Sequence, residues 1–332
     1  MTQAPTPTAD TVRRLVRSLT KEGEEGTTAE AGTGARDAAG PDVRPVAGSG
    51  STTWWVGTRH VLRLATDRAA TARRRRELRL RDLVRPHVPV AVPVSAAHGD
   101  WAPGLAYTLD TKVPGGTAEE HEVSAVGEAD LAGLLTGMRE VPARQIESLG
   151  VPHAPARSLE ALRRMAVPAA ELLRAADEFD AALLHQLTPQ GAAQLAAQPG
   201  TAVLVHHGLR GEHLVVGADG RVRGVLDWTH AVVGDPAEDI AGLALAVGSP
   251  AAVRAATLAG YGARSCLRGL WLARCDTVLA LAERLDGRSG SPLPLLRTQL
   301  RRAWEAILLE RVTEFREEGP DDEAGPDDTE QP

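Results

Sequence analysis

Two short β-rich runs, joined by a tight turn, lie in an otherwise helical half of this chain and constrain its fold more than any other feature. The runs are HLVV (213–216) and VRGVLDW (222–228), and the turn between them reads GADG. β-Branched side chains around a glycine-containing turn predict a β-hairpin. Few folds place a hairpin inside a helical lobe, so this pattern narrows the choice of fold sharply.

Around the hairpin, apolar residues recur with the 3.6-residue period of a helix. Four such stripes predict four helices: Leu131, Leu134, Leu135 and Met138; Leu172, Ala176, Phe179, Leu183 and Leu187; Leu267, Trp271, Val278, Leu281 and Leu285; and Leu296, Leu300, Trp304, Ile307 and Phe315. The second half of the chain is therefore expected to be mainly helical.

The first half reads differently. The runs STTWWV (51–56) and HVLRLA (60–65) flank Gly57 and predict two antiparallel strands. Asp67 is a suitable N-cap for a helix that Pro86 ends. Further β-rich runs follow as far as the Val113–Gly116 region, where we expect the chain to cross into the second half. This part is predicted to be a sheet with one helix.

The two ends of the chain lack the apolar residues that a core requires. Residues 1–42 are predicted to be largely flexible, and so is the tail 317–332, which holds eight carboxylates and no basic residue. That tail accounts for the net charge of −7, because the remaining chain is close to neutral. The overall charge therefore indicates no particular partner.

Composition excludes several classes of protein. The arginine run Arg73–Arg76 covers every face of one helical turn without interleaved aromatics, which favours a solvated helix over nucleic-acid binding. No apolar stretch approaches the ~20 residues of a membrane span, and the first residues do not resemble a signal peptide. The two cysteines, Cys266 and Cys275, suit a reducing compartment. We expect a cytoplasmic protein that binds neither nucleic acid nor membrane.

The segment 205–241, VHHGLRGEHLVVGADGRVRGVLDWTHAVVGDPAEDIA, carries the chemistry. It resembles the catalytic region of the aminoglycoside phosphotransferase family, which reads His-Gly-Asp-Leu, then Asn or His, a hairpin, an Asp-Trp pair and Gly-Asp-Pro-Ala-x-Asp. In this alignment His206 and Leu209 match the first motif, and the next residues to match are His213, Asp227, Trp228, Gly234, Asp235, Pro236, Ala237 and Asp239. His at position 213 resembles the macrolide phosphotransferase branch. Gly208, however, falls where the family has its catalytic Asp.

This resemblance implies an α+β, bilobal protein-kinase-like fold. The small antiparallel-sheet N-lobe with one helix, which would bind nucleotide, is expected over residues 43–113. The larger, mainly helical C-lobe containing the catalytic hairpin is expected over residues 114–316. The resemblance further implies ATP or GTP as co-substrate and Mg²⁺ held by His213 and Asp227.

Three neighbours of Gly208, namely His206, His207 and Glu212, belong to the implied catalytic loop, and His207 or Glu212 is a candidate replacement for the missing base. Asp235 and Asp239 flank a Pro-led helix start, where we expect them to cap N–H groups. Zinc bound by the three histidines is disfavoured, because their spacing lacks helical i, i+4 geometry.

In the first half, Gly48, Ser49, Gly50 and Ser51 resemble a short phosphate-covering loop, although an ordinary hairpin turn is the alternative. Arg63 stands where a kinase-like fold places the cation that contacts the nucleotide phosphates. Glu77 stands where the carboxylate that orients this cation belongs. A surface ion pair is the alternative for Arg63 and Glu77.

Two functions remain open. The first is a nucleotide-dependent O-phosphotransferase acting on a small-molecule alcohol, with antibiotics such as macrolides and aminoglycosides as candidate acceptors. The second is a catalytically impaired pseudokinase that binds nucleotide or a small ligand without transferring phosphate. Gly208 favours the second, whereas Asp227, His213 and the Arg63–Glu77 pair favour the first.

Overall fold

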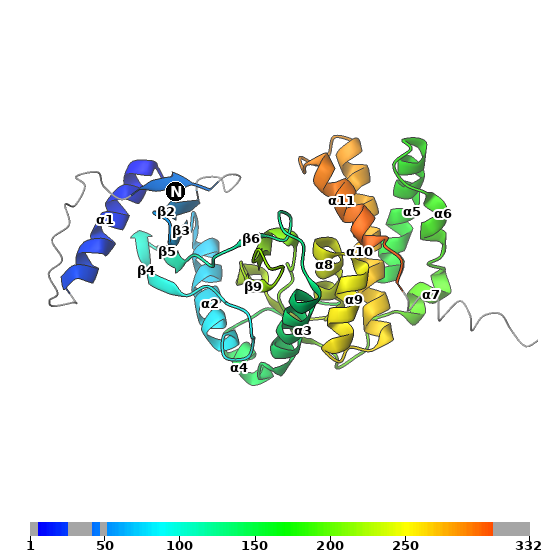
Figure 1. The fold of residues 1–332 in the computed structure, drawn as a ribbon, viewed down its shortest axis with the longest axis horizontal. Helices are drawn as coiled ribbons and strands as arrows, with labels where there is room; N and C mark the ends of the chain where they lie inside the picture. Colours follow the sequence, from blue (N-terminus) through cyan, green and yellow to red (C-terminus); the bar gives the residue numbers. More distant parts are fainter. Residues whose placement is uncertain (1–5, 26–41, 47–51, 308–332) are drawn as a thin grey trace, which may run out of the picture.

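The computed structural model describes residues 6–25, 42–46 and 52–307, which form two lobes arranged side by side (Figure 1). The smaller lobe contains an antiparallel sheet, and the larger is mainly helical with short strands embedded in it. The two-lobed α+β architecture expected from the sequence is therefore confirmed.

The N-lobe is built on a five-stranded antiparallel sheet with the order β1-β2-β3-β5-β4. Its strands are β1 (Val43–Pro45), β2 (Thr53–Val56), β3 (His60–Leu64), β4 (Ser95–Ala102) and β5 (Leu105–Thr111). Helix α2 (Arg68–Val84) begins where the Asp67 carboxylate accepts the Ala70 N–H at 2.7 Å, as the sequence predicts. It ends two residues before Pro86, which cannot continue a helix.

A second N-lobe helix, α1 (Ala9–Glu25), was not expected. Val12 and Val16 are buried in a small core with side chains of the sheet, among them Trp54 and Leu62. The prediction of a largely flexible segment over residues 1–42 is therefore wrong for residues 9–25, and residues 26–41 lie outside the described part. Apolar residues spaced like Val12 and Val16 offset the entropy cost of ordering the helix once a sheet is there to cover them.

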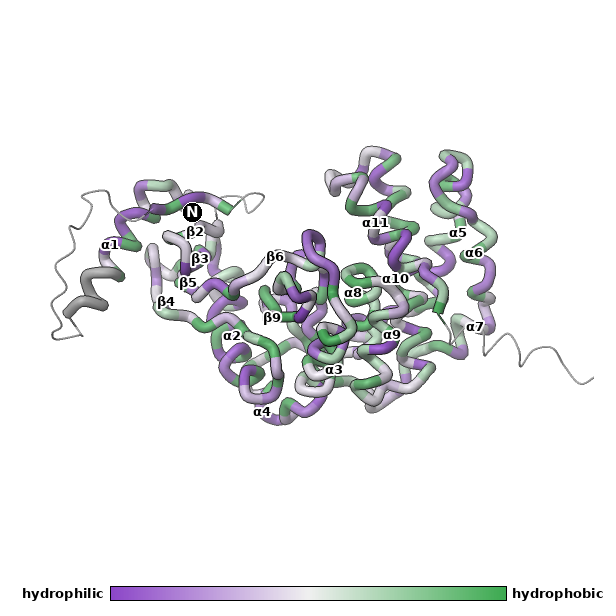
Figure 2. The backbone as a smooth tube through the Cα atoms, viewed as in Figure 1, coloured by the Kyte–Doolittle hydropathy of each residue, from purple (hydrophilic) through white to green (hydrophobic). Residues whose placement is uncertain are grey.

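The C-lobe packs its helices around one large core, and Figure 2 shows hydrophobic residues concentrated where α8, α9 and α10 meet. Its helices are α3 (Ala125–Glu140), α4 (Ala143–Ser148), α5 (Leu159–Ala175), α6 (Ala181–His185), α7 (Pro189–Gln194), α8 (Ala237–Val247), α9 (Ser249–Leu258), α10 (Ala263–Leu285) and α11 (Leu293–Ala303).

Two of the predicted helices differ from the observed ones. The stripe from Leu172 to Leu187 spans α5 and α6, which are separated by Asp177 in a left-handed conformation and by Asp180, the N-cap of α6. The stripe that starts at Leu296 belongs to α11, which ends at Ala303, so a continuous helix to Phe315 is not observed; Phe315 itself lies outside the described residues. Periodicity alone does not show where a local turn interrupts a helix.

The predicted hairpin is present as β8 (Leu214–Val216) and β9 (Val222–Val225). The segment that joins the lobes supplies a third strand, β6 (Gly116–Thr117), which pairs with β8. A separate pair, β7 (Val203–Val205) and β10 (Val232–Gly234), brackets the loops on either side of the hairpin. Residues 206–213 and 226–231 hold the polar side chains of the motif. Each segment is a loop that contains one short 3-10 helix (Gly211–His213 and Trp228–His230) and is anchored at both ends by strands.

Asp239, in the first turn of α8, fixes the loop that follows β7. Its carboxylate accepts the backbone N–H of His206 at 2.7 Å and that of His207 at 2.8 Å. The expectation that Asp239 caps its own helix is therefore wrong. Asp235 does act near the helix start, where it accepts the Ala237 N–H at 3.0 Å and pairs with Arg268.

Within the described ranges, no helix is both long enough and apolar enough to cross a membrane.

Replacing both Val12 and Val16 by Ala should lower the free energy of unfolding by about 2–4 kcal/mol, because each change removes buried methyl groups and leaves a cavity. Chemical denaturation measures the effect. Arg14→Ala, on the exposed side of the same helix, is the matched control and should change stability by less than about 0.5 kcal/mol. Equal effects of the two changes would mean that α1 does not pack on the sheet in solution.

Asp239 also generates a prediction about pH. Burial raises the pKa of Asp239 to about 7, against the two backbone N–H donors, which lower it. Because the folded state then holds the proton more tightly than the unfolded chain, ionisation destabilises the fold as pH rises from about 4 to about 7, by up to about 4 kcal/mol. The stability of the parent relative to Asp239→Asn should therefore fall across this range and level off above it.

Unfolding free energies of both proteins, measured from pH 4 to pH 8, test this expectation. Taking the difference removes contributions common to both proteins, including that of His206. A difference that stays flat or rises over the range would contradict the prediction.

Candidate active site

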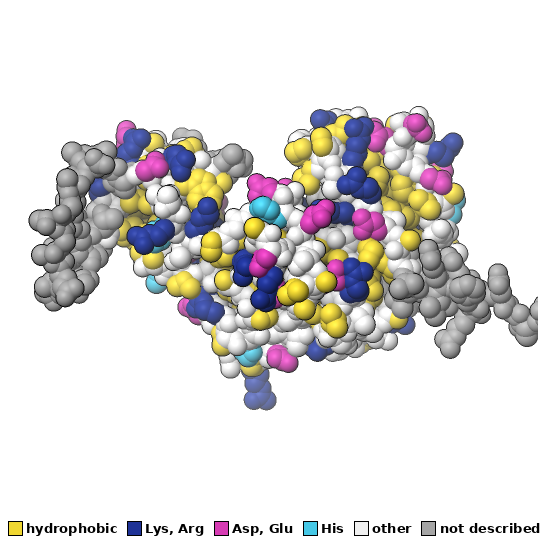
Figure 3. Space-filling model, viewed as in Figure 1, with side chains coloured by type: hydrophobic (Ala, Val, Ile, Leu, Met, Phe, Trp, Pro, Cys, Tyr) yellow, Lys and Arg dark blue, Asp and Glu magenta, His cyan; other side chains and the backbone are white. Residues whose placement is uncertain are grey.

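A cavity of about 620 Å³ lies between the two lobes. Trp55 and Val61 of the N-lobe sheet and Val215 and Leu226 of the hairpin region provide apolar walls. Charged side chains from both lobes complete the lining, namely Asp110, Lys112, Arg63, Glu120, Glu212, His213 and Asp227. Figure 3 shows the molecular surface notched between the lobes, with acidic side chains along the lower rim of the notch. A flat aromatic group and a charged group can both be accommodated here.

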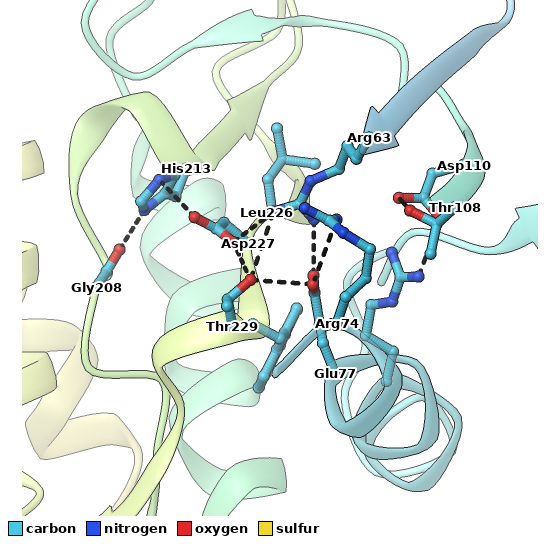
Figure 4. A network of polar contacts seen from close by, with 12 residues as sticks. Arg63, Arg74, Glu77, Thr108, Asp110, Gly208, His213, Leu226, Asp227 and Thr229 are labelled. Carbon is cyan, nitrogen blue, oxygen red and sulfur yellow. Dashed lines mark hydrogen bonds and ion pairs between the residues drawn. The ribbon is translucent and has the colours of Figure 1, made fainter. Parts of the chain in front are cut away.

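Arg63 joins the two lobes at this cavity (Figure 4). From β3, its Nη1 donates to Glu77 Oε1 of α2 at 2.8 Å, and its Nη2 donates to Asp227 Oδ1 of the C-lobe at 2.7 Å. The Thr229 hydroxyl lies 2.6 Å from Asp227 Oδ1 and 3.0 Å from Glu77 Oε2, and donates to one of them at a time. The structure thus places the two residues paired by the sequence analysis together and adds Asp227 to them.

The electrostatics of this cluster keep its acid ionised. Burial alone would raise the pKa of Asp227, but the Arg63 charge and the Thr229 hydrogen bond outweigh burial and hold that pKa well below its usual range. A second buried cation, Arg74, approaches Glu77 to 4.0 Å. Burial, followed by repulsion from Arg63, lowers the pKa of Arg74 to about 10. Asp227 is therefore a carboxylate, with full negative charge, at any pH near neutrality.

His213 is oriented for ligation by the backbone of the preceding loop. Its Nδ1 lies 2.7 Å from the Gly208 carbonyl oxygen. A carbonyl can only accept a hydrogen bond, so Nδ1 carries the proton and the lone pair is left on Nε2. That Nε2 lies 3.7 Å from Asp227 Oδ2, the carboxylate oxygen that neither Arg63 nor Thr229 contacts. Such a tautomer fixed from outside is typical of a ligating histidine.

The two donors Asp227 and His213 fit a divalent cation that takes its remaining ligands from phosphate oxygens and water. No group of three or more His, Cys, Asp or Glu side chains gathers around a common point in the part of the chain that the structure describes. The Asp227 carboxylate would leave room for phosphate oxygens and water, which is how Mg²⁺ is usually bound, and His213 Nε2 beside it would complete the ligation or hold a metal-bound water. Zinc held by His206, His207 and His213 does not fit, because these three side chains do not gather around a common point in the described structure.

The loop of residues 206–208 has the conformation that the family motif requires. His207 has a φ of 60°, the left-handed region that suits glycine, and it occupies the Gly of His-Gly-Asp. Gly208 shows no positive φ. A Cβ built there would lie 3.5 Å from His206 Nδ1 and 3.6 Å from His213 Nδ1, both ordinary contacts. Position 208 therefore has room for a Cβ, and its backbone does not adopt the left-handed conformation that would require glycine.

His206 supports this loop from within the core. It is fully buried, its ring contacts Trp228 edge-on with centroids 4.7 Å apart, and its Nδ1 has no partner among the described residues. Burial lowers the pKa of His206 to about 3, so the imidazole is neutral.

The remaining predicted residues divide into three groups. Glu212 lines the cavity and its Oε1 lies 3.9 Å from His213 Nε2, whereas His207 is exposed and does not line it. The candidate phosphate-covering loop lies outside the described residues; it comprises Gly48, Ser49, Gly50 and Ser51. The site role of Thr229 was not predicted. The available signal was its position directly after the Asp-Trp pair, where its hydroxyl reaches Asp227 and Glu77.

A model of the phosphotransferase enzyme family (APH) matches residues 42–274. A stretch of 41 residues is 49% identical to the uncharacterized protein YcbJ of Bacillus subtilis (strain 168) and covers 12% of this chain and 13% of that protein. This chain therefore spans only a small part of that relative's length in the match.

Solved structures of similar fold agree. The GDP complex of wild-type aminoglycoside 2'-phosphotransferase-IIIa has a TM-score of 0.56 at 19% identity, covering 80% of this chain and 93% of that one. Macrolide 2'-phosphotransferase type I has a TM-score of 0.54 at 18% identity, covering 89% of this chain and 98% of that one. Macrolide 2'-phosphotransferase MphH from Brachybacterium faecium has a TM-score of 0.52 at 20% identity, covering 88% of this chain and 99% of that one. The kinase-like fold is confirmed, and because the family model matches well over half of its residues, this chain belongs to the aminoglycoside phosphotransferase family.

Proposed function

We propose that this protein transfers the terminal phosphoryl group of ATP or GTP to a hydroxyl group of a small molecule. One observation supports this most: Arg63 contacts both Glu77 and Asp227 at the interlobe cavity, where His213 Nε2 faces the same Asp227. Phosphoryl transfer depends mainly on positioning and on charges that stabilise the phosphate oxygens. These residues supply both signs of charge at one place.

Each residue has a distinct part in the proposal. Asp227 and His213 would hold Mg²⁺, which supplies positive charge to the phosphate oxygens when bound. Arg63 would contact the nucleotide phosphates and Glu77 would orient it; Gly48, Ser49, Gly50 and Ser51 remain candidates for phosphate contact from their sequence. Thr229 ties Asp227 to Glu77 and so keeps the C-lobe carboxylate in register with α2.

Relatives of similar fold suggest the class of acceptor. They include aminoglycoside and macrolide phosphotransferases, and one of them is a complex with GDP and kanamycin. We infer an alcohol-bearing small molecule of that kind, an antibiotic being the leading candidate. A reducing cytoplasm suits Cys266 and Cys275, which are buried free thiols.

Because position 208 has no carboxylate, another group would have to accept the proton of the acceptor hydroxyl. Glu212 is the stronger candidate, because it lines the cavity near His213, whereas His207 is exposed outside it. If neither acts as base, the protein is the alternative named from the sequence, a pseudokinase that binds nucleotide without transferring phosphate. Gly208 is the observation that favours this second function.

Asp227→Ala should abolish the Mg²⁺-dependent part of nucleotide binding, because it removes the carboxylate proposed to hold Mg²⁺ beside His213. Isothermal titration with ATP and GTP, with Mg²⁺ and with EDTA, measures this. Asp219→Ala, in the turn of the same hairpin and paired only locally with Arg223 and Arg221, is the matched control and should bind as the parent does. Unchanged Mg²⁺-dependent binding in folded Asp227→Ala would refute the metal assignment.

Gly208→Asp should raise phosphate transfer or nucleotide hydrolysis by up to ~10²–10⁴, the usual contribution of a general base. A Cβ at 208 would make only ordinary van der Waals contacts, so the single change is compatible with the fold. The double variant His207→Gly/Gly208→Asp restores the family's His-Gly-Asp and should be at least as active, because glycine relieves the left-handed backbone at 207.

Three results separate the alternatives when both variants keep the parent's nucleotide affinity. Higher activity in the variants means that only the base was missing. Parent activity that Glu212→Gln abolishes, with no gain from Asp at 208, means that Glu212 has taken over. Nucleotide binding without transfer in every form means that the protein is a pseudokinase.

A further inference from the structure

A second cavity, of about 380 Å³, lies on the N-lobe between α2 and β4. Four arginines of α2 and its C-terminal end line it, namely Arg75, Arg79, Arg81 and Arg85. Asp82 is the one acid in the lining, and His98 of β4 faces it from the other wall. This part of α2, which includes Arg75 of the arginine run, therefore borders a partly open, basic hollow.

The positive charge of this cavity is only partly balanced. Arg75 pairs with Asp100 at 2.8 Å, but both side chains are largely exposed, so the pair is weak. Arg85 pairs with Asp82 at 2.8 Å. Arg79 makes no ion pair or hydrogen bond with any described residue. The lining therefore carries an excess of positive charge that its own carboxylates do not neutralise.

Buried donors in the lining also lack acceptors. The side chain of Arg81 is only 2% exposed and gives one hydrogen bond, from Nη2 to Asp110 at 3.0 Å. Its Nε and Nη1, and the Nε of Arg85, are buried without a partner among the described residues. An unpaired buried donor costs about 1–3 kcal/mol, and more when it is charged. These three donors, on two arginines of the lining, have no acceptor within the described part of the chain.

We propose that this pocket, named here the α2/β4 pocket, binds the phosphate group of a small phosphorylated molecule or free phosphate. Guanidinium groups bind oxyanions through paired N–H donors. A phosphate group offers three strong acceptor oxygens, one more than a carboxylate, to the unpaired guanidinium of Arg79 and to the unpaired donors of Arg81 and Arg85. Leu78 and Val94 add an apolar wall suited to the body of an esterified ligand.

The α2/β4 pocket is distinct from the interlobe cavity. Arg81 lines the first and its partner Asp110 lines the second, so this buried ion pair separates them. None of the arginines of the pocket contacts Asp227 or His213, and Arg63 does not line the pocket. Its ligand is therefore not the nucleotide of the proposed reaction.

Calorimetric titration of the full chain with inorganic phosphate, and separately with glycerol 3-phosphate, tests the proposal. EDTA in the buffer keeps divalent metal out of the interlobe cavity, and low ionic strength limits screening. The parent should bind at least one probe saturably, and tighter binding of glycerol 3-phosphate would identify an esterified ligand over free phosphate. Arg79→Ala should weaken that binding by about tenfold or more, the equivalent of one charge-assisted contact.

Arg73→Ala is the matched control, since Arg73 is an exposed arginine of the same helix that does not line the pocket. It should leave the affinity within about twofold. Both variants should keep the parent's melting temperature and Mg²⁺-dependent nucleotide affinity, which separates this test from that of the proposed function. Lack of saturable binding in the parent at about 10 mM probe, or equal losses in Arg79→Ala and Arg73→Ala, would overturn the proposal.

Discussion

The guanidinium group of Arg63 determines how the two lobes meet. It is one side chain from β3, yet it holds Glu77 of α2 and Asp227 of the C-lobe at the same time. Because the Glu77 and Asp227 side chains are largely buried, losing Arg63 would leave two carboxylates without their shared cation, and breaking a buried ion pair in this way typically costs about 3–5 kcal/mol. The position of α2, the geometry of the interlobe cavity and the ionisation of Asp227 all depend on this contact. The planar fork of arginine, unlike a lysine ammonium, can serve two carboxylates in fixed directions.

The C-lobe site depends on a different kind of support. Its loop is held through main-chain groups: Asp239 accepts the amides of His206 and His207, and the Gly208 carbonyl fixes the tautomer of His213. Burial opposes the charge on Asp239, so the anchoring carboxylate lies near the middle of its own titration at neutral pH. The scaffold of a phosphotransferase is thus retained even though one side chain of its motif has been replaced.

Elements whose formation depends on nearby residues could be predicted from the sequence, whereas features that depend on contacts between distant segments could not. Period, turn residues and caps were enough to predict β2, β3, α2, the hairpin and the long C-lobe helices α3 and α10. The ion pair of Arg63 with Glu77 followed from the family resemblance. Helix α1 was missed because its apolar stripe stabilises a helix only when the N-lobe sheet covers it, which is a tertiary effect. The role of Asp239 was missed for a similar reason, since its partners lie more than thirty residues away and are backbone groups.

The hydrogen bond from His213 to a backbone carbonyl, not to a side chain, has a consequence for how such sites diverge. Every amino acid offers the same carbonyl, so the imidazole keeps its orientation whatever residue stands at 208. The orientation of His213 and the identity of the side chain at 208 are therefore independent of each other. A side chain at 208 can therefore be changed without disturbing the contact that orients His213. The geometry beside Asp227 and the chemistry available at position 208 depend on different groups of the same loop, one on its main chain and the other on its side chains.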